Sequence, residues 1–309
     1  LVEEVIGEDS DRCAAAAREA ERLARHTDDG RLIGLASNAL YSAGILASPV
    51  TGRSVGDELI DVGDRCNAPV FAMLGHAVKA NYGAGIGDTE TARTHLDAWL
   101  ALAYRYGWRQ AQGTGAIAHA VLAHMTGDLE AAEVHYRSGH SQLERAGLDA
   151  NNLLALGLFT LRLTQGRLAE LEPLIRDVDS DAPDVVADLL ALILHATGRD
   201  AEARAARAVL HPVRRDFFHS LFTGIRGIAI CALGEKSEAS ATYRDLLPYS
   251  GRVAGADCGG FSVGPVDTIL GGLARITGKT EQAAAHYGTA LAVAERCGCK
   301  EWIAAVQDR

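Results

Sequence analysis

A short pattern recurs six times along this chain: a glycine, a small or apolar residue five positions later, and usually a tyrosine or an aliphatic residue nine positions later. Successive glycines are 40, 39, 32, 36 and 44 residues apart. A self-similar period of this size is typical of stacked helical hairpins, in which the glycine forms the turn between two helices. The pattern therefore predicts an all-α chain with a curved binding surface. The six glycines are Gly87, Gly127, Gly166, Gly198, Gly234 and Gly278.

The residues that follow each glycine predict how the helices pack. Leu171 stands five positions after the third glycine, and a tyrosine such as Tyr136 stands nine positions after several of them. A small residue lets the two helices of a hairpin approach closely, and the tyrosine fills the gap to the next helix. These offsets resemble the tetratricopeptide pattern in a lengthened, degenerate form. We expect an α-solenoid of about seven helical hairpins, built as a single domain over residues 1–309. In the other five repeats the small residue is Ala92, Ala132, Ala203, Ala239 or Ala283.

Helical periodicity and the positions of glycine and proline set the expected elements. One helix is expected at residues 10–26, and a last helix starts near Lys300. Pro173 falls inside a second helix, so a kink or a late start is expected there. Residues 251–260 form the longest irregular stretch. The expected hairpins pair residues 32–47 with 54–66, 69–86 with 88–105, 109–126 with 128–146, 151–165 with 168–179, 184–197 with 200–211, 216–233 with 235–247, and 263–277 with 280–297.

Charge and composition exclude several classes of function. The net charge of −10 argues against direct binding of nucleic acid, because contact with a phosphate backbone needs clustered Lys and Arg. The sequence has no run of about 18 apolar residues, so we expect no membrane partner. The six cysteines are sparse for this length and favour reduced thiols in a cytoplasmic protein. Because the chain begins with Leu1 rather than Met, we interpret it as a fragment of a longer protein.

Three short strings resemble reactive motifs but lack their context. Gly260-Phe-Ser262-Val-Gly264 matches a nucleophile elbow, which requires a preceding strand that the sequence does not predict. Residues 272–280 have one residue too many between their glycines for a phosphate loop. Cys297-Gly-Cys299 lacks a second cysteine pair for a metal site. We expect no catalytic residue, no metal ligand and no cofactor, with a hydrolase based on Ser262 as an alternative that would require β-sheet.

A concave groove is the remaining candidate for a functional site. If each turn glycine aligns with the tetratricopeptide turn, the first helix of every hairpin lines this groove. The lining is then mostly small and apolar, and it lacks the lysines with which such domains clamp a peptide carboxylate. An apolar peptide, an internal helix or a small apolar ligand fits better. If the alignment slips, some of these residues are core instead. The candidate ligand- or partner-binding residues are Asn81, Val121, His124, Thr160, Asp188, Leu192 and His195.

The region from residue 246 onward carries a resemblance to a known family. It contains Leu246-Leu-Pro-Tyr-Ser-Gly-Arg252, Leu270-Gly-Gly-Leu-Ala274, Glu281-Gln-Ala-Ala-Ala-His286-Tyr and Gly298-Cys-Lys-Glu-Trp302-Ile-Ala304. These strings resemble the C-terminal helical-repeat region of large actinobacterial transcriptional regulators, of the Streptomyces antibiotic regulatory protein and signal-transduction NTPase type. The more family-like repeats span residues 216–309. Cys299 departs from the family pattern, which usually has alanine there.

The resemblance implies a cytoplasmic, non-catalytic domain that senses a ligand or a partner and controls transcription. In such regulators a DNA-binding part and a nucleotide-switch domain precede the repeats. The implied partners are therefore those upstream domains, another protein or a small apolar ligand. The alternative from another class is a stand-alone tetratricopeptide scaffold or adaptor for protein assembly. An upstream nucleotide-switch domain in the full gene would decide between the two.

Overall fold

The structure, a computed structural model, describes residues 10–27, 29–42, 49–179, 183–208 and 212–309. Helices make up most of these ranges, which confirms the predicted all-α fold. The described residues form no β-strand, and their one isolated β-bridge joins Val253 to Pro265. None of the described helices has both the length and the apolar character that a bilayer crossing needs.

Helices that follow one another in the chain pack against each other in neighbouring pairs. Within the described ranges, three short 3₁₀ helices accompany them: η2 (Leu168–Leu171), η3 (Leu247–Tyr249) and η4 (Ala256–Cys258). The α-helices are α2 (Ser10–Thr27), α3 (Gly30–Ser42), α4 (Pro49–Arg65), α5 (Pro69–Gly85), α6 (Thr89–Arg105), α7 (Arg109–Met125), α8 (Leu129–Arg145), α9 (Asn151–Gln165), α10 (Glu172–Asp179), α11 (Pro183–Ala196), α12 (Asp200–Ala206), α13 (His219–Leu233), α14 (Lys236–Leu246), α15 (Val266–Ile276), α16 (Thr280–Cys297) and α17 (Lys300–Gln307).

The six predicted turn glycines all have the left-handed backbone that a tight turn after a helix requires. Their φ angles lie between 68° and 82°. After two of them an aspartate caps the next helix. Asp88 accepts a hydrogen bond from the Thr91 amide, and Asp128 accepts one from the Ala131 amide, each at 3.0 Å. These bonds satisfy amides that the first turn of a helix leaves without a partner.

The small residues after the turns are buried between helices, as predicted. The five alanines are at most 3% exposed. Tyr136 of α8 packs its ring on Gly157 of α9, where an added Cβ would lie 2.6 Å from the ring. Tyr287 of α16 packs instead on Gly271 of α15, the preceding helix of its own hairpin, and not on the next helix as predicted. Glycine and alanine therefore determine how closely these helices approach.

Several boundaries differ from the sequence prediction. Helix α4 begins at Pro49 rather than at residue 54, because proline is favoured in the first turn of a helix. Pro173 is the second residue of α10, which follows η2, so the expected late start is confirmed. Helix α12 ends at Ala206 and α13 begins at His219, so the connection between them is longer than predicted. Parts of two expected helices, 43–47 and 209–211, lie outside the described residues.

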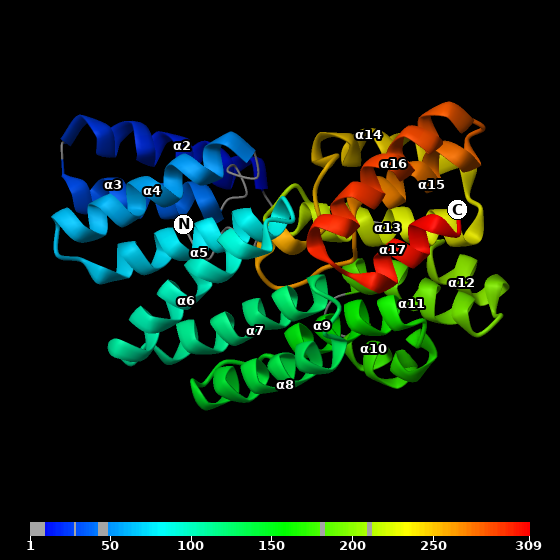
Figure 1. The fold of residues 1–309 in the computed structure, drawn as a ribbon, viewed down its shortest axis with the longest axis horizontal. Coiled ribbons are helices and arrows are strands. Elements are labelled where there is room, and N and C mark those ends of the chain that lie inside the picture. The colour runs from blue at the N-terminus through cyan, green and yellow to red at the C-terminus, as the bar shows by residue number, and fades with distance from the viewer. Residues whose placement is uncertain (1–9, 28, 43–48, 180–182, 209–211) are drawn as a thin grey trace.

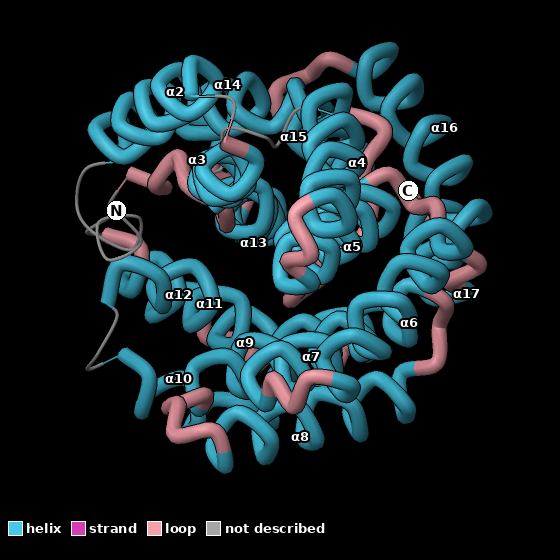
Figure 2. The backbone as a smooth tube through the Cα atoms, turned by 90° about the vertical axis from the view of Figure 1, so that its left-hand side faces the viewer, coloured by secondary structure: helices cyan, strands magenta, loops and turns pink. Residues whose placement is uncertain are grey.

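The helices are arranged around a common centre (Figures 1 and 2). In Figure 2, α3, α5, α9, α11 and α13 lie toward the middle, whereas α2, α8, α10, α12 and α16 lie toward the outside. The chain descends from α2 to α8 and returns to α16 in Figure 1, which brings late helices beside early ones. The ring of Trp302 in α17 lies 5.6 Å from the ring of His124 in α7, measured between centroids.

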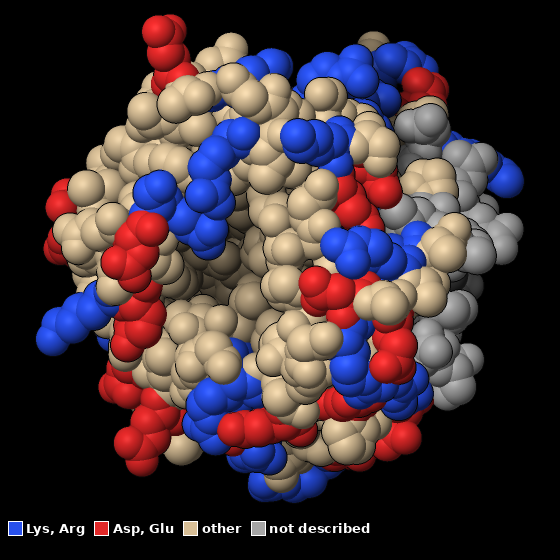
Figure 3. Space-filling model, turned by 90° about the vertical axis from the view of Figure 1, so that its right-hand side faces the viewer, with Lys and Arg blue, Asp and Glu red and all other residues tan. Residues whose placement is uncertain are grey.

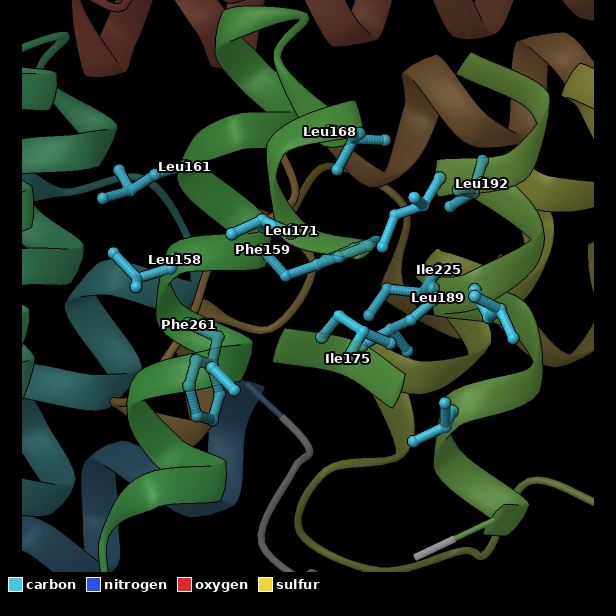
Figure 4. Packing of buried hydrophobic residues seen from close by; sticks show 14 of the residues in the cluster. Leu158, Phe159, Leu161, Leu168, Leu171, Ile175, Leu189, Leu192, Ile225 and Phe261 are labelled. Carbon is cyan, nitrogen blue, oxygen red and sulfur yellow. The ribbon is translucent and has the colours of Figure 1, made fainter. Parts of the chain in front are cut away.

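The largest apolar cluster fills the space between α9, α11 and α13. Figure 4 shows side chains from these helices, η2 and α10 gathered together. Phe261 joins them, although it belongs to the loop before α15, and it is 1% exposed. A loop residue from late in the chain thus packs in a core that is formed mainly by earlier helices.

Candidate functional site

Residues 250–265, which we call the inner loop, connect η3 to α15 and pack against helices from much earlier in the chain. The amide of Val253 donates a hydrogen bond to the carbonyl of Gly85, at the end of α5 (2.9 Å). The hydroxyl of Tyr136 donates to the carbonyl of Gly260 (3.1 Å), across 124 residues of sequence. These contacts place the inner loop on the inward side of α5, α8 and their neighbours.

Asp257 anchors the inner loop to α13. The hydroxyl of Ser220 donates to Asp257 Oδ1 (2.7 Å) and accepts from the amide of Gly255 (3.2 Å). Arg252 lies 3.8 Å from the other carboxylate oxygen. Burial raises the pKa of Asp257, and Arg252 and Ser220 partly oppose this by favouring the charged form. Polar contacts therefore hold the inner loop in place in addition to packing.

Two of the predicted groove residues lie directly under the inner loop. The side-chain amide of Asn81 donates to the hydroxyl of Tyr41 and lies so close to Gly259 that an added Cβ there would clash with it. Val121 is 1% exposed and borders a void of about 10 Å³ together with Asn81 and Gly259. The inner loop thus covers this part of the predicted groove.

His124 and Thr160, two further predicted groove residues, are completely buried. His124 Nε2 lies 2.8 Å from Thr164 Oγ1 of α9. Burial lowers the pKa of His124 to about 3, so the imidazole is neutral near pH 7. Thr160 donates its hydroxyl to the carbonyl of Gly157 within α9 (2.9 Å). Both residues pack in the interior, and a ligand-binding role for either stays a prediction.

Asp188 of α11 is the centre of a buried charged cluster. Its two carboxylate oxygens accept the Nε–H groups of Arg207 (2.7 Å) and Arg226 (2.9 Å). Arg207 also pairs with Glu235 and, at 3.2 Å, with Glu238. The Arg207 side chain is only 2% exposed. A buried charge is tolerated only when it is paired, so this cluster depends on Asp188.

Arg207 is the member of the cluster whose importance sequence reasoning missed. It stands nine positions after Gly198, where the other repeats have a tyrosine or an aliphatic residue. A cation at an apolar position requires an anion close by. Asp188, on the first helix of the same hairpin, supplies it. An arginine at a position that is otherwise tyrosine or aliphatic was therefore the sequence signal for a buried charged cluster.

A cavity of about 70 Å³ lies beside Asp188, between α11, α13 and residues 212–218. Phe222 and Ile225 form part of its apolar wall, and Arg226 lies on its charged side. Phe218 also borders it, and the ring of Phe218 lies 6.4 Å from that of Phe261 in the inner loop, between centroids. Phe218 therefore lies between the cavity and the inner loop.

The other two predicted residues of α11 do not border this cavity. Leu192 is 4% exposed and belongs to the large apolar cluster. His195 is half-exposed, and its Nδ1 lies 2.8 Å from Asp200 Oδ1 at the start of α12. Of the seven predicted residues, only Asp188 borders the cavity, and Asn81 and Val121 lie together under the inner loop. The other four line neither place: His124, Thr160 and Leu192 are buried elsewhere, and His195 is half-exposed.

The strings that resemble reactive motifs occupy packed positions. Ser262 is completely buried in the inner loop, and its Oγ has no hydrogen-bond partner within the described ranges. Burial raises the pKa of the Cys297 thiol to about 11 and that of Cys299 to about 12, so both are protonated near pH 7. The part of the chain that the structure describes contains no group of three or more His, Cys, Asp or Glu side chains placed to hold a metal ion.

Comparison with known protein families and with characterised proteins finds no match for this chain. The fold, the inner loop and the cavity beside Asp188 are therefore the observations from which a function can be inferred.

Proposed function

We propose that this chain is the ligand- or partner-sensing helical-repeat domain of a bacterial transcriptional regulator, with no catalytic role. We also propose that its helices form a tetratricopeptide-like α-solenoid of about seven hairpins. The left-handed turn glycines, and the buried alanines five positions after five of them, support the repeat architecture. The strings from residue 246 onward support the regulatory assignment.

The cavity beside Asp188 is the observation that carries this proposal. Ligand pockets usually combine an apolar lining with a few fixed polar groups. Here Phe222 and Ile225 provide apolar surface, and the two guanidinium groups that bind Asp188 hold the polar side in place. With a volume of about 70 Å³, the cavity favours a very small molecule with an apolar body and one hydrogen-bonding group over an extended peptide.

Helix α13 links the cavity to the inner loop. Phe222 and Arg226 border the cavity, and Ser220 on the same helix binds Asp257 of the inner loop. A ligand that shifts α13 would therefore also shift an anchor of the inner loop. Regulation needs a ligand to distinguish two states by only about 1–3 kcal/mol, which such a displacement can provide.

The surface charge supports promoter recognition by another part of the regulator. The chain carries a net charge of −10, which repels phosphate. On the face that Figure 3 shows, basic and acidic side chains are interspersed rather than separated. Several of the arginines are paired with carboxylates, as Arg137 is with Glu133 and Arg199 with Glu172. We propose that this chain does not contact DNA directly.

The test uses a variant that fills the cavity. Phe222→Trp enlarges one wall and replaces no residue of the Asp188 cluster, and Tyr104→Trp, at an exposed tyrosine of α6, is the matched control. Each is introduced into the full gene in its own host, and transcripts are compared with those of a deletion strain. If Phe222→Trp alone changes the transcripts that the deletion changes, the proposal is supported. If the deletion itself leaves transcription unchanged, the scaffold alternative is favoured.

A further inference from the structure

Tyr243 of α14, His286 of α16 and Asp267 of α15 form a chain of hydrogen bonds. Nδ1 of His286 lies 2.7 Å from Asp267 Oδ1, and Nε2 lies 2.8 Å from the hydroxyl of Tyr243. A carboxylate can only accept, so in the neutral imidazole Nδ1 carries the hydrogen and Nε2 has the lone pair. The Tyr243 hydroxyl therefore donates to His286. A hydroxyl, a base that accepts from it and a group that orients the base are the parts of an activated nucleophile.

Asp267 is held in place by other contacts. It is completely buried, and its carboxylate also accepts the hydroxyl of Ser250 (2.8 Å) and the amide of Gly251. These bonds fix the carboxylate beside Nδ1 of His286. The negative charge stabilises the imidazolium that forms when Nε2 takes a proton. Asp267 is therefore a positioning residue that keeps Nε2 directed at Tyr243.

The same position of the repeat holds a tyrosine in two other hairpins. Tyr136, Tyr243 and Tyr287 each stand nine residues after a turn glycine. Tyr136 is 1% exposed and donates to the carbonyl of Gly260, which is not a base. The hydroxyl oxygen of Tyr287 is buried. Tyr243 and His286 are both partly exposed. Of these three tyrosines, Tyr243 alone combines an imidazole base with access to solvent.

Lys279 gives this place a positive charge. Its Nζ lies 5.5 Å from the centroid of the Tyr243 ring, and it directly precedes α16. A cation beside the nucleophile favours a reagent that carries negative charge. A phenol is a weak nucleophile while it is protonated, so the reagent also needs a good leaving group. An acyl phosphate has both properties, because its carbonyl carbon is activated and its leaving group is an anion.

We propose that Tyr243 is a modification site that takes the acyl group of a small acyl phosphate. The hydroxyl oxygen of Tyr243 attacks the carbonyl carbon while Nε2 of His286 takes the hydroxyl proton. The bond between that carbon and the phosphate oxygen breaks. The phosphate leaves with the electron pair of this bond and receives the proton from His286. The products are an acyl ester of Tyr243 and inorganic phosphate.

The acyl group stays on Tyr243, so the reaction modifies the chain and does not turn over a substrate. An acylated Tyr243 has no hydroxyl hydrogen to donate to His286, whose other ring nitrogen contacts Asp267. Asp267 also holds Ser250 and Gly251, the first two residues of the inner loop. The modification therefore removes a contact that supports the start of the inner loop. This inference goes beyond the proposed regulatory function and does not depend on it.

The experiment treats the 309-residue chain with acetyl phosphate at about pH 7.5 and follows the initial rate of acetylation at each tyrosine by mass spectrometry of peptides. An ordinary phenol, with a pKa of about 10, is almost entirely protonated at this pH. General-base catalysis contributes about 10²–10⁴-fold, so Tyr243 should react at least about 100-fold faster than Tyr104, which is 60% exposed. Both rates come from the same folded protein.

Three variants separate the roles of the side chains. His286→Gln keeps a group that can accept from the hydroxyl but cannot take its proton, so Tyr243 should react only as fast as Tyr104. Tyr243→Phe should remove the label. Lys279→Gln should slow the reaction with acetyl phosphate more than the reaction with p-nitrophenyl acetate, which is neutral. Urea denaturation shows whether each variant is folded.

Equal rates at Tyr243 and Tyr104 in the parent chain would overturn the proposal, as would fast acetylation of Tyr243 in folded His286→Gln. A phosphoryl group on Tyr243 in place of an acetyl group would overturn the assignment of acyl transfer. Equal slowing of both reagents by Lys279→Gln would overturn the choice of an anionic donor.

Discussion

The inward faces of the first helices have different contacts in two parts of the molecule. From α5 to α9 the inner loop covers them, and Asn81 and Val121 lie beneath it. From α11 to α13 they border a cavity and the charged cluster at Asp188. Both regions use the first helix of a hairpin, Asn81 and Val121 six residues before the turn glycine and Asp188 ten residues before it. The repeat therefore determines where a helix lies, whereas the residues on its inward face determine what that face contacts.

The first prediction concerns the covered region and has the largest expected effect. Val121→Glu would place an unpaired carboxylate where the native side chain is 1% exposed, and should lower the free energy of unfolding by more than about 4 kcal/mol. Urea denaturation followed by circular dichroism measures this. Val134→Glu, at a residue 62% exposed, should change it by at most about 0.5 kcal/mol. Equal, small effects of the two substitutions would mean that the inner loop does not cover Val121.

The second prediction concerns the charged cluster beside the cavity. Asp188→Ala removes the anion that two guanidinium groups share, and should cost about 3–5 kcal/mol because it deprives two largely buried cations of one of their ion-pair partners. Asp245→Ala is the control, since it removes a surface pair with Arg215 that should contribute at most about 1 kcal/mol. Urea midpoints and slopes give both values. A cost below that of the control would show that the cluster is solvated.

The third prediction compares two glycines of the inner loop. Gly251 and Gly259 both have a left-handed backbone, with φ of 79° and 67°. Gly251→Ala adds a Cβ that meets nothing within 4 Å, so only the backbone cost of about 1 kcal/mol applies. Gly259→Ala adds a clash with Asn81 and should cost about 2–3 kcal/mol in total. Identical unfolding free energies for the two variants would mean that Gly259 does not contact α5.

The fourth prediction, the smallest in effect, uses the pH dependence of stability. The pKa of His124 is lowered to about 3 in the folded chain, so below about pH 6.5 the unfolded chain binds a proton that the folded chain does not. Stability therefore falls as the pH falls. From about pH 6 to 5 the parent chain should lose about 1 kcal/mol more than His124→Gln, which cannot titrate. Parallel stability curves for the two proteins would contradict the burial of this imidazole.

The sequence pattern predicted the turns and the close helix contacts within a hairpin, because these depend on residues that are near one another in the sequence. A glycine such as Gly127 and an alanine such as Ala132 act within one hairpin, so the sequence pattern located both. The inner loop could not be predicted in this way, because contacts such as that of Tyr136 with Gly260 join residues 124 positions apart. Asp188 was identified as a candidate from its place on the first helix. The cavity beside it depends on the long connection before α13, which the sequence predicted to be shorter.

The packing of the inner loop against α5, α8 and α13 is the feature that joins the two regions. Amide hydrogen exchange of the parent chain, followed by mass spectrometry, tests it directly. The amides of Val253 and Val263 donate to backbone carbonyls at 2.9 and 3.0 Å, and the loop is largely buried. Peptides that cover residues 252–264 should therefore exchange as slowly as those from α13. Exchange of these peptides within seconds, at the rate of an exposed loop, would mean that the inner loop is not packed against these helices.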